Sequence, residues 1–98
     1  MLSFKREDTK QYSSAEALVT VTFRIPDAAE SDVILAEIWK DSKIFEKFVK
    51  EIKSADIEGW ENGIKAEEVV KMPGIYSLVH LVSLDIVDAM RGDFKRKK

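Results

Sequence analysis

One stretch decides the fold of this chain: residues 73–90, which read PGIYSLVHLVSLDIVDAM. Its apolar side chains recur at helical spacing, about 100° per residue, and form one stripe roughly 120° wide. The stripe comprises Ile75, Leu78, Val79, Val82, Ile86, Ala89 and Met90. This pattern predicts an amphipathic helix from about Ile75 to Arg91 that packs against a core, with Gly92 as its C-cap.

The same helix carries a second group of apolar side chains that lie off the stripe. They are Leu81, Leu84 and Val87, and they are interrupted by His80, Asp85 and Asp88. Three such side chains exposed on a small domain would be a liability unless another chain covered them. We therefore predict that this second side contacts a protein partner.

Composition excludes several classes of protein. With 98 residues, 45% hydrophobic and 35% charged, residues 1–98 read as one globular domain. A net charge of -2 with interleaved acids argues against nucleic-acid binding, and the basic run Lys95–Lys98 reads as a solvated tail. The chain has no cysteine, which fits a cytoplasmic setting. No apolar run is long enough to span a bilayer and the N-terminus lacks a signal-peptide core, so we expect a soluble cytoplasmic protein.

Residues 2–25 form the predicted β region. Apolar and polar residues alternate from Ala17 to Ile25, which predicts a strand. A weaker alternation over Leu2–Arg6 predicts a first strand, with the polar stretch Glu7–Ser14 turning the chain back. The two segments form a hairpin, or alternatively the second strand stands alone.

Helical signals follow Pro26, which ends the strand because it cannot donate to a ladder. Asp27 and Glu30 predict a capping box for a helix from about Ala28 to Lys40. Its apolar side comprises Ile34, Leu35, Ile38 and Trp39. A second helix, starting at Asp41-Ser42 and reaching about Ser54, completes a helical pair over residues 28–54; its apolar side is Ile44, Phe45, Phe48, Val49 and Ile52.

The remaining segments are a loop, a short helix and a tail. Gly59, Asn62 and Gly63 mark residues 55–65 as a loop. A short helix over 67–72 stops at Pro73, the terminal helix completes residues 66–92, and residues 93–98 form a basic tail. The predicted fold class is α+β: an N-terminal β-hairpin, or single strand, packed against three to four α-helices.

No constellation of residues points to catalysis. The single histidine, His80, reads as a partly exposed polar residue, because its neighbours in sequence supply no ligand or catalytic partner. Asp85 and Asp88 read as solvated positions of a helix, and the acids near Asn62 do not follow the order of a calcium loop. The chain also lacks a glycine-rich phosphate cradle. We predict a non-enzymatic protein with no catalytic residue, cofactor or metal.

The two tryptophans leave two interpretations open. Tryptophans in small domains mostly belong to the core, while aromatic residues are also enriched at interfaces. Trp39 and Trp60 are therefore candidates for protein contact beside Leu81, Leu84 and Val87.

The order of these signals resembles a known family of small proteins. Residues Phe23-Arg24-Ile25-Pro26 and Asp27-Ala28-Ala29-Glu30 are similar to that family's "FRRPTAxE" strand-to-helix junction, with Ile25 in place of the second arginine. Three further pieces follow: a loop tryptophan in Ile57–Glu61, a short helix Lys65–Val70 ending at Met72-Pro73-Gly74, and a final aliphatic helix with a charged tail. The order and spacing of these pieces, which cover about three quarters of the chain, resemble those of the tail assembly chaperones of tailed phages and prophages.

The resemblance implies a function. Such chaperones act in the host-cell cytoplasm, bind the helical tape measure protein and help recruit tail tube subunits during virion morphogenesis. It implies these two partners for this chain, and the second apolar side of the terminal helix suits a helical client. Self-association is a further expectation. The alternatives are a structural tail component of the completion or connector type and a small prophage-encoded regulator.

Overall fold

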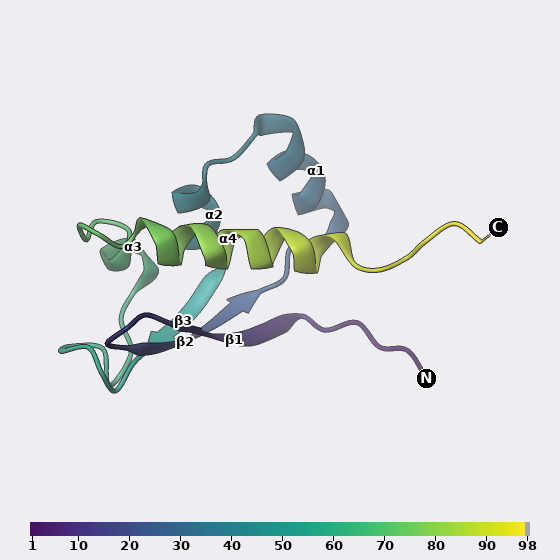
Figure 1. The fold of residues 1–98 in the computed structure, drawn as a ribbon. Helices are drawn as coiled ribbons and strands as arrows, with labels where there is room; N and C mark the ends of the chain where they lie inside the picture. Colours follow the sequence, from purple (N-terminus) through teal and green to yellow (C-terminus); the bar gives the residue numbers. More distant parts are fainter. Residues whose placement is uncertain (98) are drawn as a thin grey trace.

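The computed structural model describes residues 1–97. Over these residues the chain forms a three-stranded antiparallel sheet and four helices. Its elements are β1 (Glu7–Ser13), β2 (Leu18–Arg24), α1 (Ala28–Glu37), α2 (Asp41–Phe48), β3 (Val49–Lys53), α3 (Ala66–Val69) and α4 (Tyr76–Arg91). The strand order is β1-β2-β3, and the helices lie over one face of the sheet (Figure 1). The fold is α+β, as the sequence predicts.

The strand β2 confirms the period of two. Val19, Val21 and Phe23 are buried, while the residues between them are half-exposed. The predicted first strand over Leu2–Arg6 is wrong: β1 is the polar stretch Glu7–Ser13, which pairs with β2 from Glu7–Arg24 to Ser13–Leu18. An edge strand needs few apolar residues, because the ladder hydrogen bonds and one half-buried aromatic side chain, Tyr12, hold it in place.

The predicted helical pair over residues 28–54 is also wrong at its second end. The helix α2 stops at Phe48, and the next five residues form β3, which pairs with β2 (Val21 opposite Ile52). Ile52 is buried in the strand, and the apolar pattern of a helix would also place it on the buried side, so that pattern does not separate helix from strand. Strand pairing decides between helix and strand here, because β3 forms hydrogen bonds with the backbone groups on the second edge of β2.

The capping box of α1 is confirmed. Asp27 accepts a hydrogen bond from the backbone N–H of Glu30 (2.8 Å), and Glu30 accepts one from the backbone N–H of Asp27 (3.1 Å). The helix is shorter than predicted, because Ile38 turns into the left-handed region (φ 50°) and ends it. Of its predicted apolar side only Ile34 is buried, while Leu35 and Ile38 are exposed.

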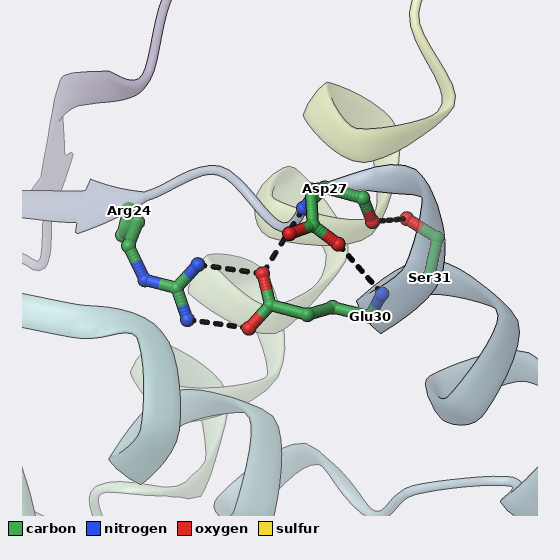
Figure 2. A network of polar contacts seen from close by, with 4 residues as sticks. All are labelled: Arg24, Asp27, Glu30 and Ser31. Carbon is green, nitrogen blue, oxygen red and sulfur yellow. Dashed lines mark hydrogen bonds and ion pairs between the residues drawn. The ribbon is translucent and has the colours of Figure 1, made fainter.

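A charged network fixes the junction between β2 and α1 (Figure 2). The guanidinium of Arg24 donates two hydrogen bonds to the carboxylate of Glu30, at 2.6 and 2.7 Å, and lies 4.8 Å from the centre of the Phe48 ring. Ser31 adds a hydrogen bond to the carbonyl of Asp27 (2.8 Å). The hydrogen bonds from Arg24 and from the Asp27 backbone lower the pKa of Glu30 to about 2.

This network predicts an acid-sensitive contribution to stability. The folded pKa of Glu30 lies below its unfolded value of about 4.3, so the contribution is present above that pH and is lost as pH falls towards 2. Solvent screening at the partly exposed Arg24 limits it to on the order of 1–2 kcal/mol. Urea unfolding of the wild type and of Glu30→Gln, followed against pH, measures it. The stability difference between the two should shrink from pH 6 to pH 2, and a constant difference would contradict this account.

The core lies between the sheet and the helices. Val79, Val82 and Ile86 of α4 are buried in it, and the other residues of the predicted stripe are partly buried around them. The terminal helix begins at Tyr76, one residue after the predicted start, and Gly92 follows it with φ 68°. The predicted short helix is α3, shifted to Ala66–Val69. Residues 55–65 form the expected loop, apart from a single bridge between Ile64 and Ile52.

Candidate protein-binding surface

Two leucines lie exposed on α4, on the side away from the core. Leu81 is 49% exposed and Leu84 is 46% exposed, one turn apart on the helix. Val87, which the sequence groups with them, is half-buried and packs against the core. The second apolar side of α4 is therefore narrower than predicted and consists of Leu81 and Leu84, which we call the α4 leucine pair.

A shallow groove borders Leu81. It has a volume of about 210 Å³ and lies between the β1–β2 turn and the first half of α4. Its apolar lining includes Tyr12, Ala17, Ile57, Ile75, Leu78 and Leu81. The α4 leucine pair thus continues into a depression that can accept further apolar side chains.

Tyr12 attaches this side of α4 to the sheet. Its hydroxyl donates a 2.5 Å hydrogen bond to the carboxylate of Asp85. Burial and the hydrogen bond with Asp85 raise the pKa of Tyr12 well above its ordinary value, so the hydroxyl keeps its proton. Asp85, which reads from the sequence as a solvated position, instead orients the leucine side of α4 relative to β1.

The polar side chains of α4 gather on a carboxylate that sequence reasoning missed. Asp41, in the first turn of α2, accepts from the hydroxyl of Tyr76 (2.9 Å), from Nδ1 of His80 (2.7 Å) and from the hydroxyl of Ser83 (3.1 Å). Burial raises the pKa of Asp41, but the hydrogen bonds from His80, Tyr76 and Ser83 outweigh it and leave the pKa below its usual range. Asp41 is therefore ionised, and the proton of the bond with His80 sits on Nδ1.

The hydrogen bonds of this Asp41 cluster hold two helices together and do not have the arrangement of a catalytic relay. A nucleophile relay needs the hydroxyl to donate to the imidazole, which in turn donates to the carboxylate. Here the hydroxyl of Ser83 and the ring of His80 both bond to Asp41 instead. The cluster ties α4 to the start of α2, and the anionic side chain is stabilised by its place in the first helical turn. The spacing i, i+4, i+7 of Tyr76, His80 and Ser83 was the only hint of it in the sequence.

The tryptophans do not add to the surface. Trp60 is 3% exposed and belongs to the core. Trp39 is half-buried: its ring packs at 6.4 Å from that of Phe48, and Lys43 lies 4.2 Å above it. Of the five residues predicted for protein contact, the structure therefore leaves Leu81 and Leu84 accessible on one surface.

One of the acidic residues before Asn62, Asp56, has a structural place as well. Asp56 accepts a hydrogen bond from the backbone N–H of Leu18 (2.9 Å), which fixes the loop after β3 to the start of β2. Among residues 1–97, no three His, Asp or Glu side chains are grouped so that they would hold a metal ion. Within the same residues, every helix falls short of the length and apolarity that crossing a membrane requires. Of the basic tail, Lys98 lies outside the described residues.

Comparison with known proteins assigns no relative. No protein-family model matches the chain, and no curated protein or solved structure matches it.

Proposed function

We propose that this protein is a non-enzymatic assembly chaperone that binds an apolar helical segment of a client through the α4 leucine pair. One observation carries the proposal: α4 buries Val79, Val82 and Ile86 in its own core and still exposes Leu81 and Leu84. Burying a leucine side chain on association contributes on the order of 1.5–3 kcal/mol. Together with the adjoining groove, the pair suits the i, i+3, i+4 apolar stripe of a client helix.

The resemblance set out from the sequence supplies the client. In a tail assembly chaperone the helix bound would belong to the tape measure protein, and the site of action would be the host-cell cytoplasm. The first motif of that resemblance forms the capped junction between Arg24 and Glu30, which is a local structural unit and does not distinguish one family from another. Recruitment of tail tube subunits stays a prediction of the resemblance.

Loss of the leucine pair should abolish client binding. We expect Leu81→Glu/Leu84→Glu to keep the far-UV circular dichroism and thermal unfolding of the wild type, because both side chains are already half in water. Co-purification with a co-expressed tape measure protein, the proposed client, should fall at least about tenfold, since two charges replace buried apolar contacts.

Leu35→Glu is the matched control, because Leu35 is 55% exposed but lies on α1. It should leave client binding unchanged. If both variants bind the client like the wild type, the surface is assigned wrongly. If the double variant unfolds, the leucine pair belongs to the core, and that result also contradicts the proposal.

A further inference from the structure

One edge of the sheet is open along its whole length. β1 is the outer strand of the order β1-β2-β3, and among residues 1–97 its only strand neighbour is β2 (Figure 1). The opposite edge is partly covered, because Ile52 of β3 bridges to Ile64. An open edge offers unpaired backbone donors and acceptors to another strand.

Two hydrogen bonds identify which residues of β1 face outwards. The N–H of Ile25 donates to the carbonyl of Arg6 (2.9 Å), and the N–H of Ser14 donates to the carbonyl of Ala17 (2.8 Å). Even-numbered residues of β1 therefore turn their backbone groups towards β2. The odd-numbered residues point their backbone N–H and C=O groups away from β2, within the plane of the sheet. These residues are Glu7, Thr9, Gln11 and Ser13.

The charges of β1 select one way of pairing the strand with itself. In an antiparallel pair related by a two-fold axis at Thr9, the outward-facing residues meet as hydrogen-bonded pairs, Thr9 with Thr9 and Glu7 with Gln11. Asp8 of each copy then stands directly opposite Lys10 of the other, in the closer type of pair. An axis at Lys10 would instead bring two lysines together. Glu7 adds no repulsion, because it already pairs with Lys50 of its own chain.

The same register finds a place for the exposed N-terminal residues. Phe4 is 75% exposed and Leu2 is also exposed; Phe4 stacks on Phe94, which is itself exposed. Continuing the register beyond β1 sets Phe4 of the second copy opposite Ser14. Phe4 lies outside β1, but both positions are even, so a strand continued to Phe4 would place its side chain on the face of the sheet to which Tyr12 reaches to bind Asp85. Ser14 lines the groove beside Tyr12 and Ala17.

We propose that two copies of this chain associate through antiparallel pairing of their β1 edges around Thr9, with reciprocal Asp8–Lys10 pairs. The two sheets form one continuous sheet, and the helices of both copies lie on the same face. Phe4 of each copy lies at the groove of the other. The Thr9 N–H, which donates to Asp8 within the chain (2.9 Å), is released to the backbone of the second copy. This inference does not rest on the proposed chaperone function.

Charge exchange in the full chain tests the register. Sedimentation equilibrium from micromolar to millimolar concentration should give a wild-type mass approaching twice 11.2 kDa. Asp8→Lys and Lys10→Asp each set like charges opposite one another and should weaken association at least about tenfold. The double variant Asp8→Lys/Lys10→Asp restores opposite charges and should associate like the wild type.

Gln11 provides a backbone test. Gln11→Pro removes an outward N–H that β2 does not use, so it should leave the circular dichroism unchanged and abolish the dimer. Gln11→Thr keeps the N–H and should dimerise. A wild type that stays monomeric at every concentration would overturn the proposal. The proposal would also be overturned if the single variants Asp8→Lys and Lys10→Asp associated normally, or if Asp8→Lys/Lys10→Asp did not regain association. A dimer that is lost only in Leu81→Glu/Leu84→Glu would overturn it as well.

Discussion

Replacing Trp60 by alanine should lower the free energy of unfolding by about 3–5 kcal/mol, the range expected for a fully buried aromatic side chain. Trp60 is 3% exposed, and its backbone accepts hydrogen bonds from the N–H groups of Ser54 and Gly63. The substitution therefore opens a cavity at the point where the loop after β3 closes on the core. Small domains are stable by about 5–15 kcal/mol, so this is a large share of the total.

Urea unfolding followed by far-UV circular dichroism measures the effect of Trp60→Ala. Trp39→Ala is the control, because Trp39 is half-buried and loses its contacts with Phe48 and Lys43 and an exposed hydrogen bond to Glu37. It should cost about 1–2 kcal/mol. Equal losses in the two variants, or an unchanged midpoint for Trp60→Ala, would show that Trp60 is not a core residue and would return it to the candidates for protein contact.

The second large effect is expected at Asp41. Asp41→Ala removes the acceptor for Tyr76, His80 and Ser83 at once, and it leaves the hydroxyl of Ser83, a 1% exposed residue, buried without a partner. An unsatisfied buried polar group costs about 1–3 kcal/mol, and the lost bonds to a charged group add to it. We expect a total loss of about 2–4 kcal/mol in the free energy of unfolding.

A double-mutant cycle separates the contact from general damage to the helix. Ser83→Ala alone leaves Asp41 bonded to two donors and should cost about 0.5–1.5 kcal/mol. In the Asp41→Ala background the same change removes the orphaned hydroxyl, so it should cost less or become stabilising. Asp41→Asn keeps an oxygen acceptor and should lie between the wild type and alanine. Fully additive effects in the cycle would mean that Asp41 and Ser83 do not act through their hydrogen bond.

The sequence predicted the surface that carries the proposed function only in part. The off-stripe leucines were found because helical periodicity assigns each residue of α4 an angle. Val87 was misplaced, because which angle is covered depends on the elements that pack against the helix, and here Val87 reaches the core. Trp60 had both interpretations open, since a tryptophan in a loop carries no periodicity that could tell burial from exposure.

By itself, the sequence determined the features that are set within one turn or one strand. The alternation in β2, the capping box of Asp27 and Glu30, and the core stripe of α4 depend on neighbours up to four residues away, and each has its predicted form. Only the tertiary structure decided that polar Glu7–Ser13 is a strand, that Val49–Lys53 leaves the helix for the sheet, and that His80 finds Asp41. These features arise from pairing between distant segments, whose hydrogen bonds outweigh the small differences in local propensity.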